Sequence, residues 1–126
     1  MRSVATFSVG LSMAKRVMFK KNSLAKILTS VPYDNGFHFY VSIGNYTGVT
    51  ATSLAEFAEK IQTIDSNSIK FHLLRNDFQK WVKNTIGDVE LAKRLNLIKG
   101  NLPEEDLRKD ILRVIQTRIA ELKSFV

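Results

Sequence analysis

The chain has 126 residues, of which 44% are hydrophobic and 25% are charged, so its length and composition are those of one folded domain. It has no cysteine and only two histidines, which excludes disulfides and thiolate metal sites and argues against a zinc site. No apolar run approaches the ~20 residues that a membrane span needs. We therefore expect a soluble, cytoplasmic protein without a cofactor.

The formal net charge of +7 is concentrated at the front of the chain. Residues 1–31 contain six basic side chains and no acidic one, whereas residues 32–126 contain 13 basic and 12 acidic side chains. An excess of cations confined to one segment is typical of an arm that binds a polyanion. We therefore divide the chain into a basic N-terminal arm, residues 1–31, and a globular domain, residues 32–126. The basic residues of the arm are Arg2, Lys15, Arg16, Lys20, Lys21 and Lys26.

The first predicted elements are short. Alternating apolar residues predict a strand at residues 5–11, and a short helix is expected at residues 24–28, before Pro32. A turn signal at residues 34–36 then opens the clearest strand, residues 37–43. One face of that strand is expected to carry Phe37, Phe39, Val41 and Ile43, and the other face His38, Tyr40 and Ser42.

Capping residues and apolar spacing predict helices in the rest of the chain. The helix starts are marked by Ser53 with Glu56, by Asp65 with Ser66, by Asp77, by Asp88 and by Pro103, and Gly100 is expected to end the fourth helix. The last helix mixes acidic residues with basic ones, so its polar face is expected to be solvated; the basic ones are Arg108, Lys109, Arg113, Arg118 and Lys123. The predicted fold class is mainly α, a compact multi-helix domain preceded by one or two short β-strands and the basic arm.

Several strings between residues 37 and 95 resemble an uncharacterised family of small helical domains, the domain-of-unknown-function family 5752. The strings are Phe37-His38-Phe39-Tyr40, Ser53-Leu54-Ala55-Glu56-Phe57 and Gly87-Asp88-Val89-Glu90-Leu91-Ala92, together with the spacing His72-x-x-Arg75-x-Asp77-Phe78-x-x-Trp81. The resemblance covers roughly half of the chain and implies a mostly helical domain. It implies no activity and no site, and the arm lies outside it.

One polar cluster, His72, Arg75 and Asp77 beside Trp81, is a candidate site for an anion or a protein partner, because a guanidinium binds phosphate or carboxylate. The structural interpretation, which is favoured, makes Asp77 a helix cap, pairs Arg75 with a nearby carboxylate and places His72 at an edge. No nucleophile elbow, zinc-helix motif or recognisable carboxylate pair accompanies the cluster, so a non-enzymatic protein is favoured over an enzyme.

Two alternatives concern nucleic-acid binding. The aromatic residues of the central strand suit base stacking, but core packing of Phe37 and Phe39 is favoured and Tyr40 is the one placed on a wet face. The arm fits RNA or DNA, alone or within a ribonucleoprotein, and less well an anionic membrane surface or a tail without a partner. Met1 and Met13 both remain possible starts. The leading hypothesis is an accessory protein that binds nucleic acid through the arm; the rival is a regulatory or protein-interaction domain that uses the cluster around His72.

Overall fold

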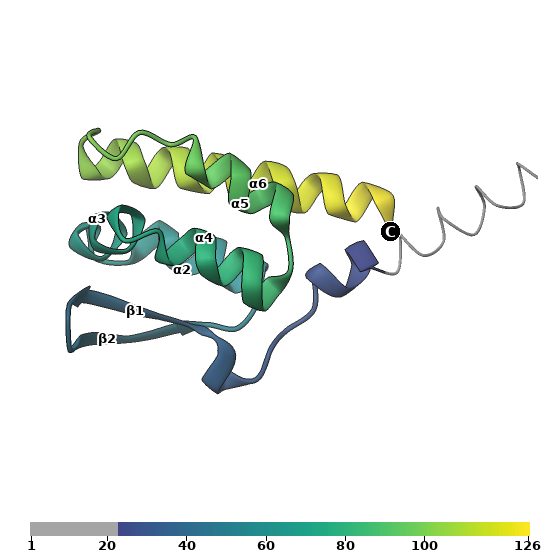
Figure 1. Ribbon diagram of the computed structural model, residues 1–126, viewed down its shortest axis with the longest axis horizontal. Helices are drawn as coiled ribbons and strands as arrows, with labels where there is room; N and C mark the ends of the chain where they lie inside the picture. The colour runs from purple at the N-terminus through teal and green to yellow at the C-terminus, as the bar shows by residue number, and fades with distance from the viewer. Residues whose placement is uncertain (1–22) are drawn as a thin grey trace, which may run out of the picture.

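A β-hairpin and a set of helices make up residues 23–126, the part of the chain that this computed structural model describes (Figure 1). Residues 23–27 are helical. The later elements are the 3₁₀ turn η1 (Tyr33–Asn35), strands β1 (Phe37–Ser42) and β2 (Asn45–Ala51), helices α2 (Leu54–Thr63), α3 (Ser66–Leu74) and α4 (Asp77–Trp81), the π-helical turn η2 (Val82–Ile86), and helices α5 (Val89–Asn96) and α6 (Glu104–Phe125). The predicted mainly α class is confirmed. The strand predicted at residues 5–11 lies outside the described residues.

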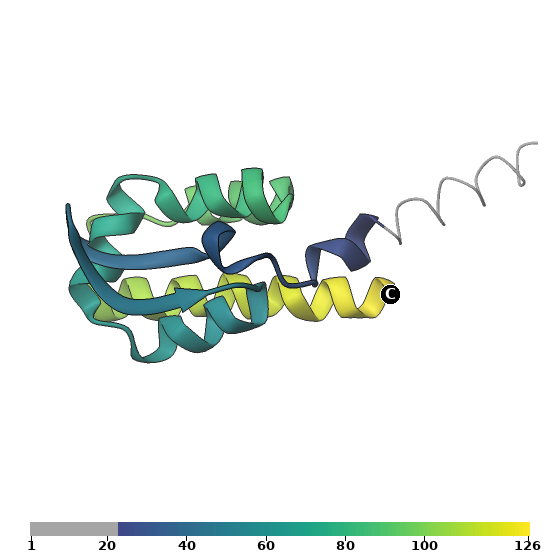
Figure 2. The same ribbon diagram turned by 90° about the horizontal axis from the view of Figure 1, so that it is seen from below.

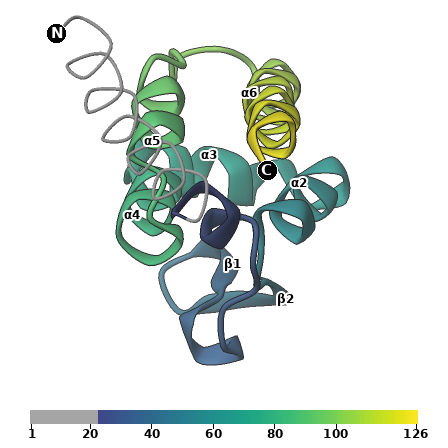
Figure 3. The same cartoon turned by 90° about the vertical axis from the view of Figure 1, so that its right-hand side faces the viewer.

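The elements stack in three layers (Figures 1 and 3). The hairpin is one outer layer, α2, α3 and α4 form the middle layer, and α5 and α6 form the other outer layer. Helix α3 contacts β1 on one side and α6 on the other, and the hairpin runs along the long axis of the molecule (Figure 2). Because α3 is covered on two sides, its buried set includes polar residues as well as apolar ones: Ser68, Ile69, His72 and Leu73.

The hairpin contains a strand that the sequence analysis did not predict. Strand β2 pairs antiparallel with β1, and the register shifts twice along β1. Such a shift interrupts the alternation of side chains between the two faces. Phe37 and Phe39 are buried as predicted, but Val41 is only half-buried, and Ile43 lies in the turn with 80% of its surface exposed. The prediction that Ile43 belongs to this strand and shares a face with Phe37 and Phe39 is therefore wrong, because β1 ends at Ser42.

Local side-chain contacts start three helices where the sequence predicted. Ser53, Asp65 and Asp88 each accept a hydrogen bond from a backbone N–H in the first turn of the following helix. In a capping box Glu56 would accept a hydrogen bond from the backbone N–H of Ser53. Here its Oε1 accepts instead from the backbone N–H and the hydroxyl of Thr52, both at 2.9 Å. These hydrogen bonds lower the pKa of the Glu56 carboxyl.

Two helix boundaries differ from the prediction. Asn76, not Asp77, is the N-cap residue of α4, and it adopts a left-handed conformation with φ of 61°. Asp77 is the first helical residue, and its carboxylate instead binds His72 of α3 and Arg75, the C-cap residue of α3. Helix α5 ends at Asn96, before the predicted stop at Gly100.

Aromatic rings join the hairpin to the middle layer. The ring of Phe37 lies 5.0 Å from that of Phe78, and the ring of Phe39 stacks on Phe57 at 5.7 Å. Phe57 in turn lies 5.3 Å from Trp81. Such ring pairs contribute ~0.5–1.5 kcal/mol each beyond the burial of their area. Contacts with α2 and α4 therefore hold the hairpin in addition to the pairing of its own two strands.

The structure describes the last part of the predicted arm, residues 23–31, and this segment contacts the domain. Ile27 is 7% exposed and belongs to the core, and the backbone N–H of Val31 donates to the carbonyl of Thr52 at 2.8 Å. Lys26 is exposed. The division of the chain at residue 31 stays a prediction, but residues 23–31 have structural contacts of their own.

The expectation that the basic residues of α6 are solvated is wrong for Arg118. Its side chain is buried, and it donates from Nε to Asp88 Oδ2 at 2.9 Å and from Nη2 to Asp88 Oδ1 at 3.1 Å. Burial is the largest single influence on the guanidinium and by itself would lower its pKa, but the hydrogen bonds to Asp88 and Glu121 and the negative charge of Asp88 together outweigh it, so the pKa is raised. Arg118 therefore stays charged and joins α6 to the start of α5.

We expect Arg118→Met to destabilise the domain by about 3–5 kcal/mol, because it leaves the carboxylate of Asp88 buried without its partner. Urea unfolding measures this difference. The matched control is Arg113→Met, on the same helix, where an exposed pair should change stability by at most about 0.5 kcal/mol. Equal stability of both variants would contradict the role assigned to the Arg118–Asp88 pair.

Candidate functional site

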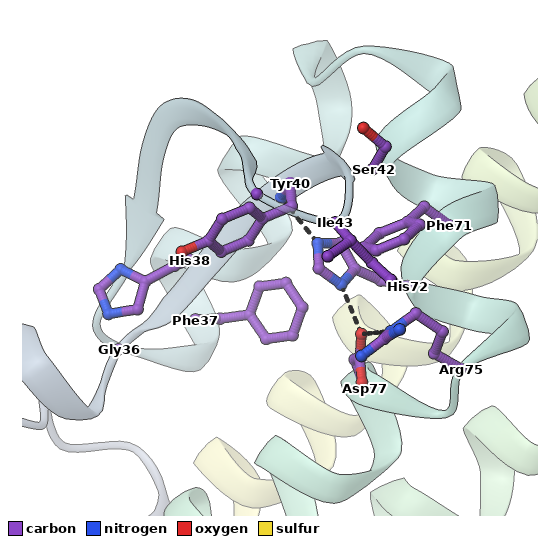
Figure 4. Close-up of a pocket in the computed structure, with 11 residues that line it drawn as sticks. Gly36, Phe37, His38, Tyr40, Ser42, Ile43, Phe71, His72, Arg75 and Asp77 are labelled. Carbon is purple, nitrogen blue, oxygen red and sulfur yellow. Dashed lines mark hydrogen bonds and ion pairs between the residues drawn. The ribbon is translucent and has the colours of Figure 1, made fainter.

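His72 lies at the junction of β1, α3 and α4 (Figure 4). It is 4% exposed, and its Nε2 accepts a hydrogen bond from the backbone N–H of Tyr40 at 2.8 Å. Because Nε2 accepts, the proton of the neutral ring is on Nδ1, which donates to Asp77 Oδ2 at 2.8 Å. Both nitrogens of the imidazole are therefore used by the protein itself.

Burial lowers the pKa of His72 below its usual value, although the hydrogen bond to Asp77 opposes this effect. Protonation of Nε2 would also turn the acceptor of the Tyr40 N–H into a second donor. The neutral ring is thus the form that fits the fold. In this arrangement neither ring nitrogen is free to accept a proton from a substrate.

Arg75 and Asp77 extend this network to the surface. Arg75 Nε donates to Asp77 Oδ2 at 3.1 Å, and the guanidinium lies over the ring of Phe71, 5.0 Å from the centroid. The side chain of Arg75 is 50% exposed. Among the described residues, its two Nη atoms have no hydrogen-bond partner, so they can bind an oxyanion from solvent.

His72, Arg75 and Asp77 border a pocket of about 440 Å³ between β1 and the end of α3. Apolar side chains of Phe37, Tyr40, Ile43 and Phe71 form most of its wall (Figure 4). Gly36, His38, Ser42, Gly44, His72, Arg75 and Asp77 complete the lining. A pocket with an apolar wall and few polar groups is typical of a binding site.

The pocket residues that the sequence analysis missed come from two elements. Phe71 precedes Arg75 by one helical turn, so i, i+4 spacing was a signal for their contact. Ile43 and Ser42 reach the pocket through the hairpin turn, and no local pattern indicated that α3 lies beside it. The sequence therefore predicted the polar side of the pocket and not its apolar wall.

Trp81 does not line this pocket. Its ring is buried among the core phenylalanines, and its Nε1 donates to the carbonyl of Asn35 at 2.8 Å. Of the arm cations, only Lys26 is described; Arg2, Lys15, Arg16, Lys20 and Lys21 lie outside the described residues.

Within residues 23–126, no group of three or more His, Asp or Glu side chains is placed to hold a metal ion. No helix in that same part of the chain combines the length and the apolar character needed to cross a membrane.

Lowering the pH from about 7.5 to about 5.5 should destabilise the domain through His72. Its folded-state pKa is lowered, so the unfolded chain binds the proton more readily, and the stability present above the ordinary pKa is lost as the pH falls below it. Urea unfolding at the two pH values tests this. His72→Gln should be less stable at the higher pH and should lose much of the pH dependence, whereas His38→Gln should retain it. An unchanged pH dependence in His72→Gln would refute the assignment.

The model of one family, "Family of unknown function (DUF5752)", matches residues 73–126. No curated protein and no solved structure matches this chain. The match begins within α3 and includes Arg75, Asp77 and the buried pair of Asp88 with Arg118. The resemblance to this family is therefore confirmed: the match overlaps the resembling strings over residues 73–95 and extends to residue 126, and over residues 73–126 the chain is similar to DUF5752, a family of uncharacterised function.

Proposed function

We propose that this protein is a non-enzymatic accessory protein that binds RNA or DNA, alone or within a ribonucleoprotein, through its basic N-terminal arm. The observation that carries the proposal is the charge distribution: six cations and no acidic residue in residues 1–31, against a near balance in the remainder. Phosphate attraction and counterion release require only closely spaced cations. The proposal needs no catalytic group.

The ion pairs of the domain support this assignment. Arg94 binds Glu121 at 2.8 Å, Arg108 binds Glu105 at 2.9 Å, and Arg118 binds Asp88. These ion pairs partly neutralise the basic side chains of α5 and α6. The excess charge therefore belongs to the arm and not to a helix face.

If all six arm cations contact phosphates, the logarithm of the affinity should fall with the logarithm of the salt concentration with a slope of about −4 on single strands and about −5 on duplexes. Fluorescence anisotropy with labelled RNA and DNA at about 50 and 200 mM salt measures this slope. Glutamine at Lys15, Arg16, Lys20 and Lys21 should flatten it. We use substitutions because truncation at Pro32 would also remove the core residue Ile27.

The matched control replaces four exposed lysines of the domain with glutamine: Lys93, Lys99, Lys109 and Lys123. It should leave the slope close to that of the unchanged chain. A flat slope in the unchanged chain, or binding to anionic vesicles that RNA does not compete away, would overturn the nucleic-acid assignment.

A second candidate function rests on the pocket: a regulatory or interaction domain that binds a protein partner or a small anionic ligand near His72, Arg75 and Asp77. The observation that favours it is the half-exposed guanidinium of Arg75, placed on Phe71 at the pocket wall. Its network with Asp77 and His72 fixes its position, so less side-chain entropy is lost on binding.

For this second function, inorganic phosphate or citrate should shift the backbone amide signals of residues 42–44 and 71–77 in ¹H–¹⁵N correlation spectra of the full chain. Arg75→Ala should abolish these shifts, because it removes the cation that receives the anion. Arg113→Ala, which removes an exposed arginine of α6, is the control and should keep them. Shifts that persist in Arg75→Ala would exclude this pocket as the anion site.

A further inference from the structure

Four aromatic rings form a continuous strip along the hairpin and the turn before it. The ring centroids of Tyr33 and His38 are 5.3 Å apart, those of His38 and Tyr46 are 6.0 Å apart, and those of Tyr46 and Tyr40 are 5.4 Å apart. Tyr33 is 59% exposed and Tyr46 is 42% exposed. We call these four residues the aromatic strip. Phe37 and Phe39, also considered for base stacking, are buried and do not belong to it.

Hydrogen bonds at the ring edges hold the aromatic strip in place. The hydroxyls of Tyr33 and Tyr46 are 3.2 Å apart, and the hydroxyl of Thr50 contacts that of Tyr46. His38 Nδ1 lies 2.7 Å from the same Thr50 hydroxyl. The polar edges are therefore tied to one another, and rings fixed in this way lose little conformational entropy when a ligand stacks on them.

The aromatic strip continues into the pocket. His38 and Tyr40 belong to both, and the opposite wall of the pocket carries Phe71 and Arg75 (Figure 4). A planar group on Tyr40 would thus lie near a guanidinium with two Nη atoms open to an oxyanion. Asp77 is also close, but its Oδ2 already accepts from His72 and from Arg75, which offsets its repulsion of an anion.

We propose that the pocket and the aromatic strip bind nucleotide units, with a base against Tyr40, the phosphate on Arg75, and neighbouring bases of a strand on Tyr46 and Tyr33. The combination of stacking rings with one cation matches the two parts of a nucleotide, as in sequence-tolerant binders of single strands. This inference extends the proposed nucleic-acid function to the domain and rests on the pocket as the anion site; the arm is not needed for it. The unit comes from a free mononucleotide or from a single strand, whereas the bases of a duplex are stacked and unavailable.

The test uses the full chain and a labelled oligouridine of about ten nucleotides, within the range of known single-strand site sizes. Tyr40→Ala and Tyr46→Ala should each weaken binding roughly 5- to 150-fold, the factor that stacking on one ring provides. Tyr40→Phe keeps the ring and should bind within about twofold of the unchanged chain. Arg75→Gln should weaken binding as well, and thermal unfolding shows whether each variant is folded.

Titration with UMP and AMP, followed by ¹H–¹⁵N correlation spectra, separates the two sources. Shifts at residues 40–44 and 71–77 with a mononucleotide would show that one unit suffices, and binding of the oligonucleotide alone would show that the aromatic strip needs several bases. Both results support the inference.

Two results would overturn it. If the arm substitutions abolish oligouridine binding while Tyr40→Ala, Tyr46→Ala and Arg75→Gln bind as the unchanged chain does, the arm binds nucleic acid and the domain does not. If neither the mononucleotides nor the oligonucleotide binds the full chain, this inference fails, and the salt titration with duplexes decides the arm function separately. Loss of binding in the domain variants alone, with the arm variant unaffected, would instead support the inference and reject the arm.

Discussion

The imidazole of His72 connects the hairpin to the helices, and the geometry around the pocket depends on it. An isolated two-stranded hairpin is marginally stable at best. Here one edge of β1 is fixed because the backbone N–H of Tyr40 donates to a buried ring nitrogen of α3, and the other nitrogen is fixed by Asp77 at the start of α4. The aromatic core fills the space beneath. One side chain thus sets the relative position of three elements, which is why its burial as a neutral ring matters for the whole domain.

The same network determines what the site can do chemically. A histidine that acts as a general base needs a free ring nitrogen to accept a proton from its substrate. His72 has no free ring nitrogen. Its effect is indirect: it holds Asp77, and Asp77 holds Arg75 above Phe71. The outcome is a cation placed at the edge of an apolar wall. Such an arrangement suits recognition of an anionic group attached to a planar or apolar body.

The two proposed binding regions use different physics. Cations of the arm would attract phosphates over a distance of about 10 Å at moderate salt, and that attraction weakens as salt rises. Rings of the aromatic strip act only in contact, and stacking depends little on salt. A protein with both would be drawn to a polyanion by the arm and would hold exposed bases with the domain. The internal ion pairs of α5 and α6 fit this division, since they leave little uncompensated charge on the helices themselves.

The sequence by itself determined the features that arise between close neighbours. Ser53, Asp65 and Asp88 begin helices because each side chain accepts from a backbone N–H a few residues away, and the apolar stripe of α6 follows from helical spacing. The tertiary structure decided the rest, because the partners lie far apart along the chain. Arg118 is buried only because Asp88 is brought to it, Tyr40 meets His72 across the layers, and the aromatic strip forms only when β2 pairs with β1. Contacts of that kind depend on how the layers pack, which no local pattern of residues specifies.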